Sequence, residues 1–135
     1  MSRVQLALNV SDVDAAVDFY SRLFGVGPAK RRPGYANFAI DEPALKLVLI
    51  ENSGAPATLN HLGVEVGSPG DVAGAEARLR GEGLPTTTQD SVSCCYAVQD
   101  KVWVSDPDGA PWEIYTVLSD ADVMGCDSTE PTPCC

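Results

Sequence analysis

Apolar and polar positions alternate along the segment from Val4 to Val10, which is the pattern of a half-buried β-strand. The segment from His61 to Val66 alternates in the same way. The further strand candidates are residues 35–40, 45–51, 95–105 and 111–118. Asp106 to Ala110, with the sequence DPDGA, is a turn between the last two of these segments.

An amphipathic helix is predicted after each of the two opening strands, because apolar residues recur there at spacings of three and four. The apolar positions are Val13, Ala16, Val17, Tyr20 and Phe24 in the first helix and Val72, Ala75 and Leu79 in the second. Ser11 with Asp14 resembles a capping box. Ser68 followed by Pro69 indicates an N-cap and a first-turn proline, and Gly25 and Gly83 are expected to end the helices.

The chain also resembles itself at a constant offset of 56 residues, between Gln5–Gly25 and His61–Gly81. The identical pairs are Leu6/Leu62, Val10/Val66, Arg22/Arg78, Leu23/Leu79 and Gly25/Gly81. Together with the order strand, helix, strand, strand in each copy, these pairs indicate a duplicated module. Residues 120–135 lose this periodicity and gain Asp, Ser, Thr and Pro, so we expect a flexible tail there.

Three strands carry a polar residue in the phase opposite to their apolar residues. Gln5 lies opposite the phase of Leu6 and Leu8, and His61 occupies the equivalent place in the second copy. Glu113 lies opposite the phase of Trp112 and Ile114. The sequence therefore predicts an amide, an imidazole and a carboxylate on the strand faces that turn away from the helices.

This combination of nitrogen and oxygen donors suits Fe(II), Mn(II), Zn(II) or Ni(II), and three ligands leave coordination positions open. Each residue also has a simpler interpretation on its own. A single histidine at a strand start is commonly a hydrogen-bonded structural residue, and Gln5 and Glu113 taken singly resemble surface side chains. Their shared geometry is what favours a metal site.

Composition and charge narrow the classes of partner. A chain of 135 residues with 44% hydrophobic content is long enough for one domain with a core. Its net charge of −10 argues against nucleic acid and anionic membrane surfaces, which require clustered Lys and Arg. No apolar run reaches the length of a membrane span, and the start of the chain lacks the apolar segment of a signal peptide. We expect a cytoplasmic protein.

Five cysteines include two adjacent pairs, Cys94 with Cys95 and Cys134 with Cys135. This arrangement is unlike the evenly spread disulfides of small secreted domains, and a bridge between neighbours would close a strained ring. We therefore expect reduced thiols. Cys94 and Cys95 are either small hydrophobic residues at a strand edge or a pair of soft ligands.

The two copies, the turn followed by WEIY, and the positions of Gln5, His61 and Glu113 resemble the vicinal oxygen chelate superfamily, which includes glyoxalase I, fosfomycin resistance proteins and extradiol dioxygenases. The resemblance implies an α+β fold in which two βαβββ modules form a half-open mixed β-barrel with the helices outside. It implies one domain over residues 1–119, with modules at 3–52 and 59–118. It also implies that Gln5, His61 and Glu113 bind a divalent metal.

Within that superfamily, segments such as RVQLALNV, PGYANFAI, LNHLGVEVGS and CCYAVQDKVWV resemble the organoarsenical carbon-arsenic lyases and the related cadmium-induced proteins. This closer resemblance implies that Gln5, His61 and Glu113 hold Fe(II), and that Cys94 and Cys95 bind the trivalent arsenic of the substrate. It implies a non-haem Fe(II) dioxygenase that uses dioxygen to cleave the carbon-arsenic bond of methylarsenite or aromatic arsenicals and to release arsenite.

Two alternatives remain at this stage. A heavy-metal binding protein would capture cadmium or arsenic on its cysteines without turnover, and a thiol transferase of the same fold would use Mn(II) or Ni(II) without dioxygen. The sequence specifies neither the organic group of the substrate nor whether the chain is a monomer or a homodimer. It gives no fixed role to Cys126, Cys134 and Cys135.

Overall fold

The computed structural model describes residues 2–122, which divide into two compact units. The N-terminal unit comprises Arg3–Leu62, and the C-terminal unit begins at Gly63. Cys126, Cys134 and Cys135, together with residues 123–135 of the predicted tail, lie outside the described residues. Among the described residues, neither helix has the length and apolar character needed to cross a membrane.

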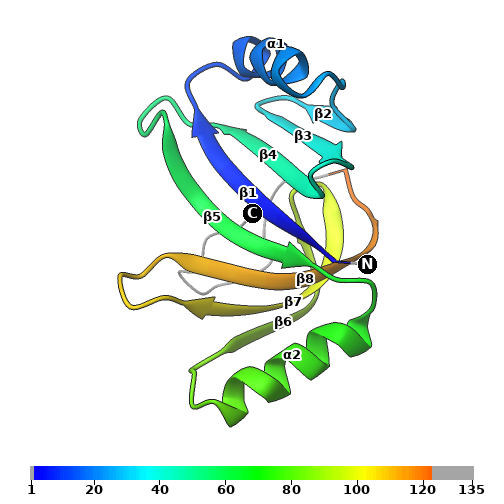
Figure 1. Ribbon diagram of the computed structural model, residues 1–135, viewed down its shortest axis with the longest axis vertical. Coiled ribbons are helices and arrows are strands. Elements are labelled where there is room, and N and C mark those ends of the chain that lie inside the picture. Colours follow the sequence, from blue (N-terminus) through cyan, green and yellow to red (C-terminus); the bar gives the residue numbers. More distant parts are fainter. Residues whose placement is uncertain (1, 123–135) are drawn as a thin grey trace. The chain divides into compact units, whose positions relative to one another are not determined.

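The N-terminal unit contains one helix and a mixed sheet (Figure 1). Its elements are β1 (Arg3–Val10), α1 (Val13–Phe24), β2 (Lys30–Arg32), β3 (Tyr35–Ile40), β4 (Leu45–Glu51) and most of β5 (Thr58–Glu65). The strand order is β2-β3-β4-β1-β5. β1 runs parallel to β4, whereas β2 with β3 and β3 with β4 are antiparallel.

The core of this unit lies between α1 and one face of the sheet. Its buried members are Val13, Val17, Ala36, Phe38, Ile40, Leu47 and Leu49. Leu6, Leu8 and Val10 of β1 pack against this cluster, as their shared phase predicted. Gln5 and Asn9 therefore lie on the other face of β1, and they are more deeply buried than the apolar residues beside them.

The C-terminal unit repeats the plan with α2 (Pro69–Gly81), β6 (Thr87–Cys94), β7 (Ala97–Ser105) and β8 (Pro111–Asp120). With the end of β5, the strand order is β5-β8-β7-β6, and β7 is antiparallel to both of its neighbours. α2 contacts β7 and β8 and buries Val72 and Leu79. In the turn after β7, the Asp106 carboxylate accepts hydrogen bonds from the backbone N–H groups of Asp108 and Ala110.

Each half of the chain thus has the order βαβββ, as the resemblance implied. The alternation pattern identified only two of the three strands after each helix. β2 and β6 were missed because KRR is short and TTQDSVSC is polar, so neither segment shows an apolar phase. β5 also begins at Thr58, ahead of the predicted start at His61.

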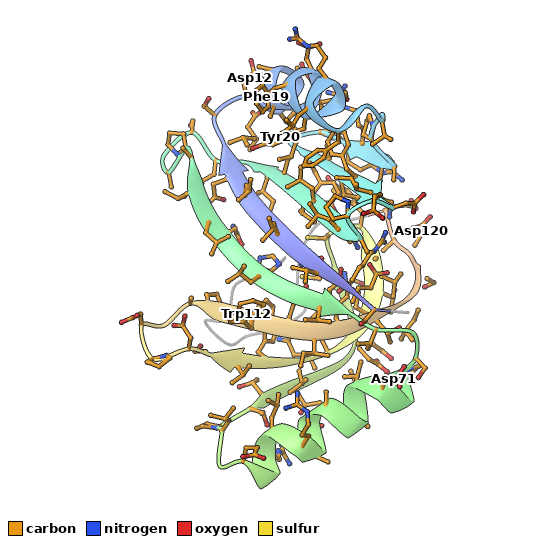
Figure 2. The ribbon with its side chains drawn as sticks, in the orientation of Figure 1. Asp12, Phe19, Tyr20, Asp71, Trp112 and Asp120 are labelled. Atoms are coloured by element: carbon orange, nitrogen blue, oxygen red, sulfur yellow. The ribbon has the colours of Figure 1, made fainter. Side chains whose placement is uncertain are left out.

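The helix caps agree with the sequence at three places and differ at two, because the C-cap of α2 is Glu82 and not Gly83. Asp12, not Ser11, caps α1, and its carboxylate accepts from the backbone N–H groups of Asp14 and Ala15 (Figure 2). Both residue types favour this position, so the pattern could not separate neighbours. Ser68 caps α2 with Pro69 in the first turn, and Gly25 ends α1 with a positive φ of 70°.

Candidate functional site

Gln5 and His61 lie in contact in the N-terminal unit. Gln5 is carried by β1 and His61 by β5, which are neighbours in the strand order. The Nε2 atoms of the two side chains are 3.1 Å apart, and the residues are 3% and 1% exposed. The offset of 56 residues that relates the two copies therefore joins two side chains that touch.

The geometry of this pair fits a divalent metal. Two ligand atoms at right angles on an octahedral ion, each at about 2.1 Å, lie about 3.0 Å apart. The two nitrogens already have this separation, and a rotation of the Gln5 amide by half a turn would put Oε1 where Nε2 lies. The imidazole nitrogen and the amide oxygen then form the neutral part of a ligand set.

Glu113 belongs to the C-terminal unit, where it forms a buried ion pair. Its Oε2 atom accepts from the Lys101 ammonium at 2.8 Å, and the side chains are 3% and 1% exposed. The ammonium also lies 5.4 Å from the ring centroid of Trp103 and 5.9 Å from that of Tyr115. A buried carboxylate requires such a partner because its desolvation is costly.

The pairing of β7 with β8 explains how these groups meet. Trp103 is directly opposite Glu113, and Lys101 is directly opposite Tyr115, so the four side chains share one face of the two strands. Lys101 was not among the predicted site residues. It lies in the same phase of β7 as Gln99 and Trp103. The alternation that identified Glu113 on β8 therefore also identifies Lys101 on β7.

Among residues 2–122, no three His, Cys, Asp or Glu side chains gather where they could hold a metal ion. The predicted set does not require such a group, since it contains only His61 and Glu113 of these types and takes its third ligand from an amide. The structure brings Gln5 to His61 and pairs Glu113 with Lys101, each within its own unit.

Cys94 and Cys95 lie at the hairpin that connects β6 to β7. Cys94 is the last residue of β6 and pairs with Ala97, so Cys95 and Tyr96 form a two-residue turn. Both have positive φ, 50° and 59°, and both are buried. Such turns favour Asn-Gly, and each non-glycine residue in this conformation costs about 1–2 kcal/mol. The chain thus tolerates a strained turn to keep Cys and Tyr there.

Gln99 ties this turn to β7. Its amide donates to the Cys94 carbonyl at 2.9 Å, and its Oε1 atom is buried without a hydrogen-bond partner. Cys94 is disulfide-bonded, whereas Cys95 is a buried thiol. The prediction of reduced thiols is therefore wrong for Cys94 in this structure, and any role of both sulfurs as ligands requires reduction first.

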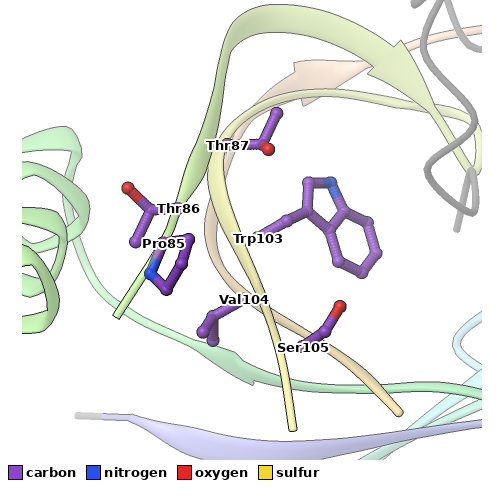
Figure 3. A pocket seen from close by; sticks show the side chains of 6 residues that line it. All are labelled: Pro85, Thr86, Thr87, Trp103, Val104 and Ser105. Atoms are coloured by element: carbon purple, nitrogen blue, oxygen red, sulfur yellow. The ribbon is translucent and has the colours of Figure 1, made fainter. Parts of the chain in front are cut away.

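A separate hollow of about 280 Å³ lies beside β7 in the same unit. It is lined by Pro85, Thr86, Thr87, Trp103, Val104 and Ser105 (Figure 3). None of the five predicted site residues is in its wall. Its polar groups are three hydroxyls and an indole, which lack the charge or the thiols that the predicted chemistry needs.

Solved structures define the class to which this fold belongs. The extradiol ring-cleaving dioxygenase from B. fuscum matches with a TM-score of 0.64 and 24% identity, covering 89% of this chain and 34% of that chain. The protein therefore has the α+β fold of the vicinal oxygen chelate class. The model of the Glyoxalase/Bleomycin resistance protein/Dioxygenase superfamily matches residues 3–114, and the chain belongs to that superfamily.

Two similar relatives are known by name. Cadmium-induced protein CadI of Mycobacterium tuberculosis is 62% identical over 125 residues, which cover 93% of this chain and 82% of the relative. A trivalent organoarsenical cleaving enzyme of Thermomonospora curvata is 58% identical over 136 residues, which cover all of this chain and 89% of the relative. These relatives put the chain in the branch that its sequence resembles.

Proposed function

We propose that this protein is a cytoplasmic enzyme that cleaves the carbon-arsenic bond of trivalent organoarsenicals with Fe(II) and dioxygen. The observation that carries the proposal is the 58% identity, over the whole chain, to a trivalent organoarsenical cleaving enzyme. The touching Gln5 and His61 side chains and the buried Glu113 carboxylate support it, because they supply suitable donors.

In this proposal Gln5, His61 and Glu113 hold the iron, and Cys94 and Cys95 hold the arsenical. Bound Fe(II) would supply the one-electron chemistry that dioxygen requires. Lys101 would keep the Glu113 carboxylate in place by holding its Oε2 atom. The buried surroundings of His61 and Glu113 would exclude bulk water from the donors.

The cysteine pair suits trivalent arsenic for two reasons. Arsenic is thiophilic, and an arsenical with one organic group has two exchangeable positions, one for each thiol. Neighbouring side chains of an extended strand point to opposite faces, but Cys95 leaves the extended conformation at φ 50°. In the turn, the two adjacent side chains are therefore not held on opposite faces, as they would be in a straight strand.

The overall reaction balances without an added reductant. Methylarsenite and one dioxygen contain the atoms of arsenite and formaldehyde. The carbon gives up the electrons that dioxygen accepts, the carbon-arsenic bond breaks, and the arsenic remains trivalent. The thiols are regenerated when water or hydroxide replaces them on the departing arsenite.

The test is arsenic speciation with Fe(II)-loaded, thiol-reduced protein. Methylarsenite should stay intact without oxygen, and arsenite should form when air is admitted. Cys95→Ser should abolish turnover while Fe(II) binding persists, whereas Ser93→Ala, next to the pair but without a thiol, should remain active. Full activity of Cys95→Ser would remove the cysteine assignment.

Sequestration is the second candidate, favoured by the 62% identity to a cadmium-induced protein. A sequestering protein would bind methylarsenite or Cd(II) but release no arsenite in either atmosphere. Turnover without dioxygen would instead indicate a transferase. The same speciation experiment therefore separates all three functions.

A further inference from the structure

A chain of hydrogen bonds leads to His61 from the loop between β4 and β5. Its first member is the backbone carbonyl of Ala55, which can only accept. The Thr58 hydroxyl therefore donates to it, at 2.5 Å. With its hydrogen used, the Thr58 oxygen accepts at 2.9 Å from the Asn9 amide, whose Nδ2 atom must face it.

The orientation of the Asn9 amide determines the direction of the remaining hydrogen bonds up to His61. Because Asn9 turns its nitrogen to Thr58, its Oδ1 atom faces Asn60 and accepts from Asn60 Nδ2 at 3.0 Å. Asn60 Oδ1 then lies 2.8 Å from His61 Nδ1. An amide oxygen only accepts, so the proton of a neutral imidazole must be on Nδ1. Each orientation follows from the Ala55 carbonyl.

The result is a histidine with a defined ligand atom. With the proton on Nδ1, Nε2 carries a lone pair, and this is the atom that lies 3.1 Å from the Gln5 amide. A ring nitrogen that bears a hydrogen cannot bind a metal, so the opposite tautomer would have to move its proton first. Metal-binding histidines commonly have their other nitrogen held by such a partner.

We infer that Asn60, with Asn9 and Thr58 behind it, is a positioning residue that fixes the His61 tautomer and presents Nε2 to the metal. The metal part of this inference rests on the proposed function, but the tautomer itself does not. The loop is fastened as well, because the backbone N–H of Ala57 donates to the Asn9 carbonyl at 3.0 Å. This hydrogen bond holds the loop that contains Ala55 against β1.

The tautomer of His61 can be measured directly, because His61 is the only histidine in the protein sequence. Protein labelled with nitrogen-15 histidine gives one pair of ring resonances, and the proton-bearing nitrogen is distinguished by its chemical shift. In metal-free protein with a neutral ring, we expect the proton on Nδ1. A proton on Nε2 would overturn the inference.

Asn60→Leu removes the acceptor at similar size, and Asn60→Asp retains an oxygen at that place. In Asn60→Leu the proton should spread to Nε2, and affinity for Fe(II) alone, measured anaerobically by equilibrium dialysis, should fall about 10- to 100-fold. Asn60→Asp should keep the Nδ1 proton and most of the affinity. An unchanged tautomer or an unchanged affinity in Asn60→Leu would overturn the inference.

Asn37→Leu is the matched control. Asn37 is a buried asparagine of the same unit whose amide donates to the Tyr35 hydroxyl, outside the chain that ends at His61. The Asn37→Leu protein should be less stable than the wild type, but its His61 tautomer and its Fe(II) affinity should be unchanged. Equal changes in both leucine variants would show a general structural effect and reject the positioning role.

Thr58→Val provides a milder variant in case Asn60→Leu does not fold, because Thr58 is exposed. It removes the hydroxyl that orients the Asn9 amide, so part of the Nδ1 proton population should move to Nε2. A wild-type protein that binds no Fe(II) would refute the proposed function. The resonances of the metal-free protein would still decide whether Asn60 controls the tautomer.

Discussion

The two units bury their polar side chains in different ways. In the N-terminal unit Gln5, Asn9 and Asn60 are neutral amides, joined by hydrogen bonds to His61 and to a loop. In the C-terminal unit Lys101 and Glu113 are ions that face each other directly. Both arrangements occur on strands with the same βαβββ plan.

The two arrangements predict different losses of stability when one side chain is replaced. A neutral amide that loses one partner retains others, and the cost is that of one unsatisfied group. A buried ion that loses its partner retains an uncompensated charge, which costs considerably more. The replacement of one ion should therefore cost the C-terminal unit more than the replacement of one amide costs the N-terminal unit.

The largest effect should come from Lys101→Met. The Glu113 carboxylate would lose its counter-ion in a buried place, so the free energy of unfolding should fall by about 3–5 kcal/mol. Urea denaturation followed by tryptophan fluorescence measures this. The double variant Lys101→Met with Glu113→Leu should recover most of the lost stability. A loss below about 1 kcal/mol in Lys101→Met would show that a buried ion pair is no more sensitive than the amide network.

Asn9→Leu should have a smaller effect. It removes the acceptor of Asn60 and the donor to Thr58, and the free energy of unfolding should fall by about 1–3 kcal/mol. The same urea titration compares it with Lys101→Met. If Asn9→Leu proved the more destabilising of the two, the prediction that the ion pair is more sensitive to substitution than the amide network would be wrong.

The smallest effect concerns backbone conformation, which both units strain at a non-glycine residue. Cys95→Gly should be more stable than Cys95→Ala by about 1 kcal/mol, because glycine adopts positive φ without the penalty of a Cβ atom. Ala57→Gly, at φ 60° in the N-terminal unit, should gain a similar amount. Thermal unfolding of the three variants tests this, and a less stable glycine at either place would show that the turn is unstrained.

Much of the fold could be predicted because it follows from periodicity. The phase of Leu6, Leu8 and Val10 identified the face of β1 that packs on α1, and the opposite phase gave Gln5. The choice of Asp12 over Ser11 as the cap could not be predicted, since it depends on which backbone N–H groups each side chain reaches. β6 was hidden for a related reason, because its partners and not its own residues make it a strand.

The site was predicted as single residues, and the structure adds their partners. Lys101 was overlooked because lysine in an alternating strand normally faces water. Its phase on β7 assigns it to the face of Gln99 and Trp103, but only the register of β7 against β8 brings that face to Glu113. Asn60 was overlooked because it adjoins His61 in sequence, and only the hydrogen-bond direction from Ala55 gives it a role. The metal ligands and the cysteine pair stay predictions.

The two-residue connection between β6 and β7 limits how this protein can be redesigned. Since Cys94 pairs with Ala97 and β7 is also held by β8, one inserted residue would shift the pairing of β6 with β7 by one position and turn the side chains of β6 to the opposite side of the sheet. Loop grafting at this hairpin should therefore preserve its length even where every side chain is exchanged. For the strand pairing, the number of residues in this connection matters more than their side chains.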